Sequence, residues 1–253
     1  MRLTRVYVPT SLAGLASLRL PEGPSGHLAR VLRLEVGAAV TLFDGHGGEY
    51  AATITAIAKQ GVSVSLGAQQ AVERESQLSI TLLQGISRGE RMDLIVQKAT
   101  ELGVTRIRPL RTLRSSVKLD AGTATRKLEH WQSIAVSACE QSGRNRLPEL
   151  LPPLTVAEGC AADDADLKLM LAVDGARPLA ALLREALAAR AGALPRGVSL
   201  LVGPEGGLDP VEEVAALRAG FASTLLGPRV LRTETAPLAA LAALQALAGD
   251  FRA

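Results

Sequence analysis

Two segments near the C-terminus of the chain combine glycines with ionisable side chains. Residues 200–207 read LLVGPEGG and contain Glu205, and residues 225–236 read LLGPRVLRTETA and contain Arg232 and Glu234. The apolar run that opens each segment predicts a buried strand, and the glycines that follow predict a loop. Ligands of parallel sheets bind at the carboxyl ends of the strands, where glycine lets the backbone approach them closely. The two loops could therefore enclose a small planar molecule.

Three charged side chains in these loops are candidates for catalysis. An extended backbone would place Arg232 and Glu234 on one side of the chain, with Thr233 and Thr235 on the other. Glu234 could serve as a general base, and it could equally form a structural ion pair, for example with Arg232. Glu205 is the second candidate base, but it could instead cap the following helix or accept hydrogen bonds from the loop backbone.

Other familiar catalytic motifs are missing from the sequence. The three histidines, His27, His46 and His130, are far apart and show no metal-ligand spacing, and no HExxH, GxSxG or CxxC motif occurs. GPEGG is not followed by Lys and Ser or Thr, as a phosphate-binding P-loop would be, and it lacks the GxGxxG pattern of a dinucleotide fold. We therefore expect no metal ion, and the serine hydrolase, kinase and dehydrogenase classes lose support.

The elements that must position these loops predict two domains. Residues 1–70 contain short β-rich runs separated by glycine-containing turns, which favours a small β-barrel. Within them, residues 25–34 have helical periodicity that would align His27, Arg30 and Arg33 on one face. A polar stretch, AVERESQ, then predicts a linker.

From residue 76 to residue 253, strands alternate with amphipathic helices, which predicts an α/β domain with a largely parallel sheet. The last helix, which begins near Ala236, is apolar on more than one face. We therefore expect this helix in a core or a subunit interface.

Positive charge is concentrated in one part of the chain. The first 147 residues hold 19 Lys and Arg against 12 Asp and Glu, a net of +7, whereas the remainder holds 9 against 13, a net of −4. A basic half of this kind predicts a polyanionic partner, although a solvated basic surface would look the same. Aromatic residues are only 2% of the chain, which argues against extensive stacking on nucleic-acid bases.

Composition and length narrow the cellular setting. The chain has 253 residues, 47% of them hydrophobic and 21% charged, which excludes disorder as the default state. The longest uncharged stretch near the C-terminus, Thr235–Gly249, is shorter than the roughly 20 residues of a membrane span. The N-terminus shows no apolar signal-peptide core. Cys139 and Cys160 form neither a disulfide framework nor a zinc motif, so we expect a cytoplasmic protein.

Several motifs in one order give the chain a family resemblance. GPEGG followed by LGPRVLRTETA resembles the C-terminal signature of the SPOUT methyltransferases. HLARVLRLEVGAAVTLFDGHGGEY, RMDLIVQKATELGVTRIRPL, RSSVK and ACEQSGRNRLPEL precede it. Over nearly the whole chain this order is similar to the RsmE-type 16S ribosomal RNA uridine-N3 methyltransferases. Arg88 stands where that family often has lysine.

The resemblance implies a fold and a cofactor. It implies a PUA-like, RNA-binding β-barrel over residues 1–70 and a SPOUT domain over residues 76–253, the latter with a mainly parallel sheet and a deep trefoil knot. It also implies a homodimer and S-adenosylmethionine bound by the knot loops. The cofactor residues implied in this way are Leu171, Ala172, Leu201, Val202, Gly203, Pro204, Gly206, Gly207, Leu226, Gly227, Val230, Leu231 and Thr235.

The implied reaction is methylation of N3 of a uridine in 16S ribosomal RNA, as free RNA or in the small ribosomal subunit. Arg232, Glu234 and Glu205 are its candidate catalytic residues, because loss of the N3 proton needs a base and builds charge that a guanidinium stabilises. Two alternatives stay open, a methyltransferase of another RNA such as tRNA and a catalytically silent RNA-binding assembly factor. The candidate phosphate contacts are Arg30, Arg33, Arg88, Arg114 and Arg144.

Overall fold

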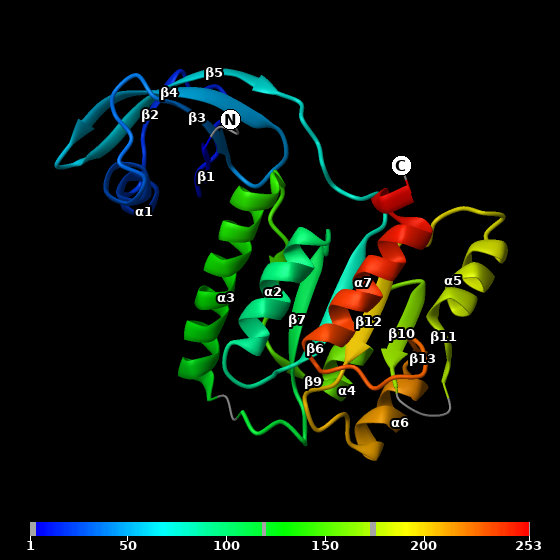
Figure 1. Ribbon diagram of the computed structural model, residues 1–253. Helices are drawn as coiled ribbons and strands as arrows, with labels where there is room; N and C mark the ends of the chain where they lie inside the picture. Colours follow the sequence, from blue (N-terminus) through cyan, green and yellow to red (C-terminus); the bar gives the residue numbers. More distant parts are fainter. Residues whose placement is uncertain (1–3, 118–119, 173–175, 253) are drawn as a thin grey trace. The chain divides into compact units, whose positions relative to one another are not determined.

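The computed structural model describes residues 4–117, 120–172 and 176–252, which form two compact units (Figure 1). The first unit contains the described residues up to Glu75 together with Cys139–Leu147, and the second contains the rest. Sequence boundaries at 70 and 76 give no sign that 139–147, at the end of a long helix, belongs with the N-terminal unit. Each unit has its own hydrophobic core.

The first unit is built on a five-stranded sheet in the order β1-β3-β4-β5-β2, in which only the β1–β3 pair is parallel. In β4, Tyr50, Ala52 and Ile54 are buried while the residues between them are not, which is the period-two pattern of a half-buried strand. The strands are β1 (Thr4–Tyr7), β2 (Ser17–Arg19), β3 (Ala39–Phe43), β4 (Glu49–Ala58) and β5 (Gly61–Gln70).

A short helix, α1 (Glu22–Gly26), and a π-helical turn, η1 (His27–Val31), cross this unit. The predicted helical face shared by His27, Arg30 and Arg33 is wrong. The helical turn ends at Val31, and Arg33 adopts a left-handed conformation with φ of 51°. The chain leaves the helix there because Leu34 turns back to pack against the core of this unit, with its N–H bonded to the carbonyl of Leu28.

The predicted linker is held by ion pairs within the first unit. Glu75 accepts a hydrogen bond of 2.9 Å from Nε of Arg144, and Glu73 accepts one of 2.8 Å from Nε of Arg146. Arg5 donates to the side chains of Asn145 and Glu49 and to the carbonyl of Arg144. These contacts explain why residues 139–147 group with the N-terminal strands.

The second unit is built on a parallel sheet in the order β11-β13-β10-β12-β6-β7-β8, with β9 also paired to β7. This arrangement confirms the predicted α/β fold with a mainly parallel sheet, and the trefoil knot stays a prediction. The strands are β6 (Ile80–Gly85), β7 (Arg106–Arg111), β8 (Glu149–Leu150), β9 (Leu154–Thr155), β10 (Leu167–Leu171), β11 (Arg177–Pro178), β12 (Val198–Val202) and β13 (Ala222–Leu225).

Helices cover both faces of this sheet. Side chains of α2, α3, α5 and α7 share one core with the sheet, and side chains of α4 and α6 share another. The α2 and α5 helices follow from amphipathic stretches, and α6 begins with Pro210 at its first position after an Asp209 cap. The helices are α2 (Arg91–Glu101), α3 (Ala121–Ser142), α4 (Val156–Ala161), α5 (Leu179–Ala188), α6 (Pro210–Arg218), α7 (Thr235–Ala248) and a final 3₁₀ turn, η2 (Asp250–Arg252).

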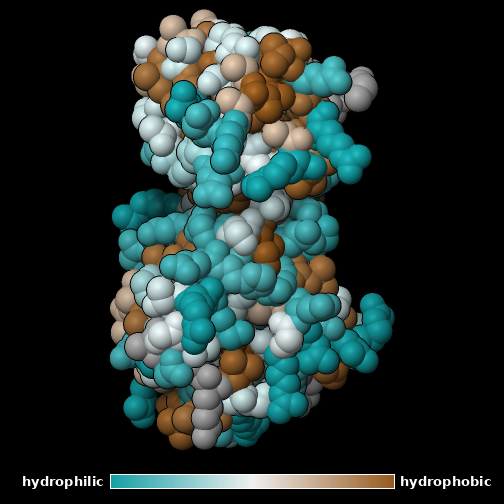
Figure 2. All heavy atoms as spheres, turned by 90° about the vertical axis from the view of Figure 1, so that its left-hand side faces the viewer, coloured by the Kyte–Doolittle hydropathy of each residue, from teal (hydrophilic) through white to brown (hydrophobic). Residues whose placement is uncertain are grey.

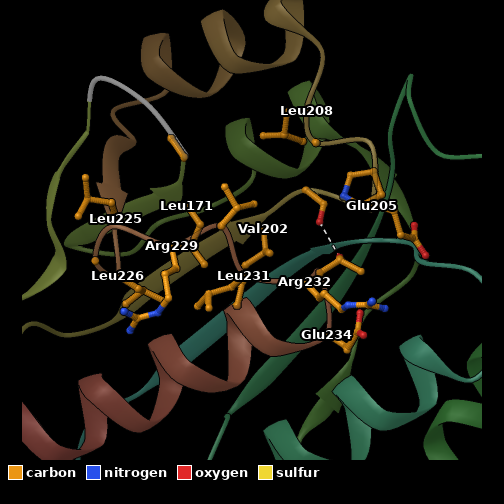
Figure 3. Close-up of a pocket in the computed structure, with 18 of the residues that line it drawn as sticks. Leu171, Val202, Glu205, Leu208, Leu225, Leu226, Arg229, Leu231, Arg232 and Glu234 are labelled. Carbon is orange, nitrogen blue, oxygen red and sulfur yellow. Dashed lines mark hydrogen bonds between the residues drawn. The ribbon is translucent and has the colours of Figure 1, made fainter.

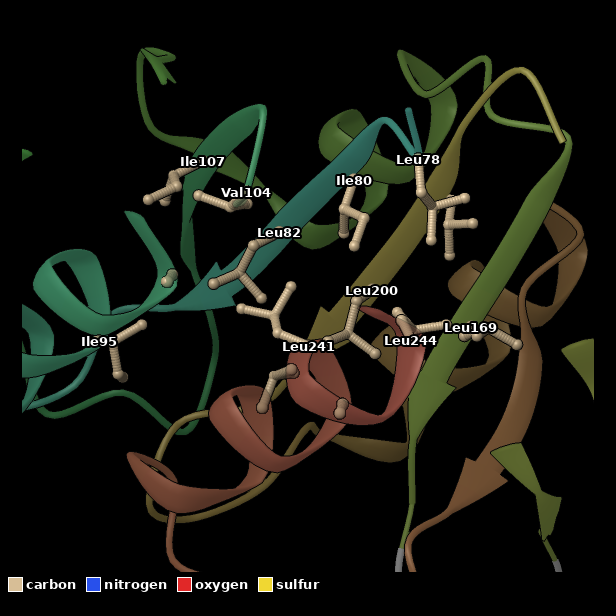
Figure 4. Close-up of a cluster of buried hydrophobic side chains, with 14 of the residues drawn as sticks. Leu78, Ile80, Leu82, Ile95, Val104, Ile107, Leu169, Leu200, Leu241 and Leu244 are labelled. Atoms are coloured by element: carbon tan, nitrogen blue, oxygen red, sulfur yellow. The ribbon is translucent and has the colours of Figure 1, made fainter. Parts of the chain in front are cut away.

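The larger core lies between the sheet and helix α7. Leu82 of β6 and Leu200 of β12 face Leu241 and Leu244 of α7 in Figure 4. Their chain neighbours point to the other face, because side chains alternate along a strand. Strands buried on both faces account for the continuous apolar runs that the sequence shows here.

Helix α7 buries one face, with a repeat of three and four residues. Gln245, which is fully buried on that face, donates to the carbonyl of Leu102 and bonds to Ser76. The expectation of a buried final helix is therefore confirmed for this face. Across the described ranges, the helices are all too short or too polar to cross a bilayer.

Candidate functional site

A pocket of about 920 Å³ lies at the carboxyl ends of the central strands of the second unit (Figure 3). It is lined by the last residues of β10, β12 and β13 and the residues that follow them, together with Arg91 at the start of α2, Glu213 of α6 and Ala236 in the first turn of α7. Neighbouring parallel strands end at the same edge of a sheet, so the topology alone brings these loops together.

The pocket has an apolar side and an ionic side. Leu171, Leu225 and Leu226 lie on one side in Figure 3, where Arg229 also lies, whereas Glu205 and Glu234 lie on the other. An apolar wall suits an aromatic ring system, and a few convergent charged groups fix the orientation of a ligand. The arrangement fits an elongated ligand with an apolar ring at one end and a reacting group at the other.

The loop between β12 and α6, residues 203–209, is tightly anchored. Glu205 Oε1 accepts the N–H of Arg88 at 3.0 Å and Nη1 of Arg91 at 2.7 Å. Burial alone would raise the pKa of Glu205, but the N–H of Arg88, its own N–H and the Arg91 guanidinium together lower it. Of the roles left open for Glu205, the structure shows hydrogen bonding to backbone, here the backbone that precedes α2. Asp209, and not Glu205, caps α6.

The loop between β13 and α7, residues 226–234, is held to the first loop by Thr233. The buried hydroxyl of Thr233 donates to the carbonyl of Gly203 at 3.0 Å, drawn as a dashed line in Figure 3, and lies 3.2 Å from Oγ of Ser87. The predicted extended backbone is wrong at this point. Residues 233 and 234 form a turn into α7, because the N–H groups of Thr235 and Ala236 both bond to the carbonyl of Arg232.

Glu234 has a different partner from the one that its spacing suggested. Its Oε2 lies 3.6 Å from Nε of Arg91, and that oxygen is buried with no hydrogen bond to any described residue. Arg232 lines the pocket beside it, and within the described residues the Arg232 side chain forms no ion pair or hydrogen bond. The ionic side therefore holds a carboxylate with one buried oxygen that has no hydrogen bond, beside the exposed guanidinium of Arg232.

Residues 74–245 match the family model of an RNA methyltransferase domain, and residues 25–67 match that of an RNA methyltransferase PUA domain. A ribosomal RNA small subunit methyltransferase E from Synechocystis is 34% identical over 235 residues, covering 92% of this chain and 74% of that protein. The chain belongs to the ribosomal RNA small subunit methyltransferase E family. The predicted family membership is thereby confirmed.

Two further members of the ribosomal RNA small subunit methyltransferase E family extend the comparison. The protein from Bacillus subtilis is 33% identical over 220 residues, which cover 86% of this chain and 85% of that one. The crystal structure of the protein from Neisseria gonorrhoeae, bound to S-adenosyl methionine, is 40% identical and superposes with a TM-score of 0.90. That comparison covers 99% of this chain and all of the other.

In the present protein, most of the predicted cofactor residues line the pocket. So do all three predicted catalytic residues, Arg232, Glu234 and Glu205. The cofactor residues that line it are Leu171, Ala172, Val202, Gly203, Pro204, Gly207, Leu226, Gly227, Val230 and Leu231. Residues 173–175, which follow Ala172, lie outside the described residues.

Three predicted cofactor residues do not line the pocket. Leu201 points to the opposite face of the sheet and is fully buried in the smaller core, because it alternates with Leu200 and Val202. A Cβ on Gly206 would lie 3.3 Å from Cβ of Arg114, on the outer side of the loop. Thr235 is exposed at the first position of α7.

The predicted RNA-binding arginines fall into two groups. Arg30, Arg33, Arg88 and Arg114 are exposed. Arg144 is buried and paired with Glu75, with only 6% of its side chain exposed. A guanidinium in this setting has no surface to offer a phosphate, so Arg144 is better described as a structural residue of the first unit.

Sequence reasoning missed the segment that precedes α2. Ser87, the N–H of Arg88 and Arg91 each bond to one of the two pocket loops. Gly85 also approaches them closely, because a Cβ there would lie 2.6 Å from the backbone nitrogen of Pro204. The sequence could have indicated this segment, because SRGER follows β6. Since β6 is the strand beside β12, the residues after both strands lie at the same edge of the sheet.

Metal ions and cysteine nucleophiles would be two other sources of catalysis among the described residues. Among them, no group of three or more His, Cys, Asp or Glu side chains could hold a metal ion. Burial raises the pKa of the Cys139 thiol to about 12 and that of Cys160 to about 11. Neither cysteine is a thiolate at neutral pH, so neither is a good nucleophile.

Proposed function

We propose that this protein transfers the methyl group of S-adenosylmethionine to N3 of a uridine in 16S ribosomal RNA. The observation that carries the proposal is the pocket itself, in which a group of leucines and the Glu234 carboxylate lie at opposite sides of one cavity. Family membership supports the reaction, and the pocket loops contain the residues that the reaction needs.

The pocket fits S-adenosylmethionine in size and lining. Its volume lies within the range of roughly 300–1,000 Å³ that is usual for small-molecule sites. We place the adenine against Leu171, Leu226 and Leu231 and the reacting end near Arg232 and Glu234. When bound, the cofactor supplies an electrophilic methyl group on a sulfonium sulfur. The relative from Neisseria gonorrhoeae was crystallised with this molecule.

In this mechanism Glu234 takes the proton from uracil N3. The N3 lone pair then forms the bond to the methyl carbon as the carbon–sulfur bond breaks, and S-adenosylhomocysteine leaves. Proton removal builds negative charge on the two uracil carbonyl oxygens, which the Arg232 guanidinium stabilises. A positioned base contributes about 10²–10⁴-fold to such a step. No covalent enzyme intermediate is needed, in keeping with the inert cysteines.

Glu205 is less suited than Glu234 to the role of base. Its hydrogen bonds from Arg88 and Arg91 converge on Oε1, and they lower its pKa and thus its readiness to take a proton. Glu234 presents a buried oxygen with no hydrogen bond to any described residue. We therefore assign the proton transfer to Glu234 and the shape of the first loop to Glu205.

RNA is expected to contact both units. Residues 76–138 hold ten Lys and Arg against five Asp and Glu, a net of +5, so most of the basic excess of the first 147 residues lies in the second unit. The side of that unit where α3 lies is mostly hydrophilic (Figure 2). Arg88 and Arg114 flank the anchored loop and would hold phosphates near the pocket, while Arg30 and Arg33 would do so on the first unit.

We also propose a homodimer formed through the second unit. Val211, Val214 and Leu217 lie along one side of α6 with 70%, 45% and 49% of their surface exposed. A contiguous apolar stripe of this kind is costly in water. Sedimentation at micromolar concentration should show a dimer, and a monomer would contradict this part of the proposal.

Calorimetry and primer extension together test the proposed reaction. S-adenosylmethionine should bind with saturable heat, whereas a silent assembly factor would show none. After incubation of 16S RNA with enzyme and cofactor, reverse transcriptase should stop next to one uridine, because a methyl group at N3 blocks base pairing. A stop in tRNA and none in 16S RNA would favour the alternative substrate.

A further inference from the structure

Arg91 is placed to act on both pocket loops from a rigid support. It is the first residue of α2, and α2 is anchored in the core by Met92, Ile95 and Val96, which are all at most 1% exposed. Arg91 itself lines the pocket. Its guanidinium therefore reaches into the site from an element that belongs to neither loop.

Two nitrogens of this guanidinium lie near two different carboxylates. Nη1 donates to Oε1 of Glu205 at 2.7 Å, and Nε lies 3.6 Å from Oε2 of Glu234. Glu205 is fixed from its other side by the N–H of Arg88. Arg91 is thus held by the anchored loop, and its Nε points to the loop that contains the proposed base.

Nothing else among the described residues fixes the Glu234 carboxylate. Within the described part of the chain, no hydrogen bond reaches its Oε2, and Arg91 is the one residue with which it forms an ion pair. The other pocket cations, Arg229 and Arg232, are exposed and form no ion pair within the described part of the chain. A carboxylate held by charge attraction alone is free to accept a proton, but its position depends on a single neighbour.

We propose that Arg91 is a positioning residue for methyl transfer, which sets the place of the Glu234 carboxylate by holding it against the anchored Glu205 loop. This inference rests on the proposed function and adds a residue to it. A general base acts only when it is within hydrogen-bond reach of the proton that it removes. Loss of Arg91 should therefore slow the chemical step more than it weakens cofactor binding.

The test compares Arg91→Gln and Arg91→Lys with the wild-type protein in single-turnover methyl transfer at saturating 16S RNA and cofactor. Arg91→Gln should cut the rate by about 10²-fold, the lower part of what a general base contributes. Arg91→Lys keeps a cation at the site and should recover part of that loss. The cofactor Kd, measured by calorimetry, should change by less than about threefold, since the apolar wall that holds the ring is untouched.

Two controls separate positioning from other causes. Lys98→Gln removes one positive charge from the far end of the same helix, where Lys98 pairs with Glu101, and should leave the rate unchanged. In a Glu234→Gln background, Arg91→Gln should have almost no further effect, because residues that act as a unit are not additive.

Three results would overturn the inference while leaving the proposed function intact. They are a wild-type rate in Arg91→Gln, losses that multiply in the double variant, and a parallel fall of cofactor affinity and rate in both Arg91 variants. The last result would make Arg91 a structural tie between the loops. Absence of methyl transfer by the wild-type protein would instead contradict the proposed function itself.

Discussion

The two loops that form the pocket differ in how they are held. Residues 203–209 are anchored by the bonds to Glu205, by a turn closed between Gly207 and Pro204, and by the Asp209 cap of α6. In residues 226–232 Val230 is 74% exposed, and the charged side chains of Arg229 and Arg232 have no partner within the described residues. One loop shapes the cavity, and the other presents reactive groups to it.

This difference separates two carboxylates that look alike in the sequence. Both follow an apolar strand and both lie within a glycine-containing loop. Glu205 accepts hydrogen bonds that hold its loop in place, and the same bonds lower its pKa and make it a poorer base. Glu234 is left with a free oxygen and one ion pair. We propose that Glu234 is the better base of the two, because the scaffold leaves its Oε2 without a hydrogen bond.

The largest effect should come from exchanging the two carboxylates for amides. Glu234→Gln should reduce the single-turnover rate by about 10²–10⁴-fold with cofactor affinity kept, because it removes the base. Glu205→Gln should weaken cofactor binding more than it slows the chemical step. Rapid-quench kinetics and calorimetry on both variants check this. Equal losses of rate would mean that the loops do not divide the work.

A smaller loss is expected from Arg232→Ala. A well-placed stabiliser of developing charge is worth roughly 2.7–4 kcal/mol, so the rate should fall by about 10²–10³-fold. Arg229→Ala removes the same charge from the same loop and provides the matched comparison. If the rate of Arg232→Ala recovers fully at high RNA concentration, Arg232 binds phosphate and has no catalytic role.

Loss of the contact between the two loops should lower the free energy of unfolding more than it lowers the rate of methyl transfer. Thr233→Val keeps the shape of the side chain but leaves the carbonyl of Gly203 without its donor, at a cost of about 1–3 kcal/mol. For a chain of this size each kcal/mol lowers Tm by roughly 2–4 °C. Thr233→Ser keeps the hydroxyl and should stay close to wild type in thermal unfolding. An unchanged Tm in the valine variant would show that this contact does not hold the loops together.

The weakest and most specific effect is expected from two arginines of the first unit. Replacing Arg30 and Arg33 by Ala should lower the log–log salt slope of RNA binding by about 0.9 per lost contact on a duplex or about 0.7 on a single strand. Cofactor affinity should stay the same. Lys59→Ala, which removes a charge from the turn between β4 and β5, is the control. Equal slopes for all three proteins would assign RNA binding to the second unit.

The sequence predicted the elements of this protein better than their contacts. Hydrophobic periodicity located the core strands and helices, because β6 and β12 are buried on both faces and α2 buries a regular stripe. It missed the two-residue strands β8, β9 and β11, which are too short to show a period. It also extended a helical face through Arg33, where tertiary packing turns the chain.

The candidate site was predictable where position along a strand decides it. Except for Gly206, the glycines and leucines of the loops after β12 and β13 line the pocket because strand ends meet at one edge. Hydrogen-bond partners were not predictable in this way. Arg91 is 114 residues from Glu205, and Glu75 is 69 residues from Arg144, so no local spacing reveals either pair. Arg144 is an example. Its positive charge suggested a contact with RNA, but in the structure it is buried and forms an ion pair with Glu75.

The central claim is that this pocket methylates N3 of uridine. Its most direct test is mass spectrometry of the nucleosides from 16S RNA after reaction with S-adenosylmethionine and either the wild-type protein or Glu234→Gln. Wild-type protein should yield 3-methyluridine at one position, and the variant should yield almost none in the same time. A methyl group on a ribose or on another ring atom, or equal yields from both proteins, would contradict the account.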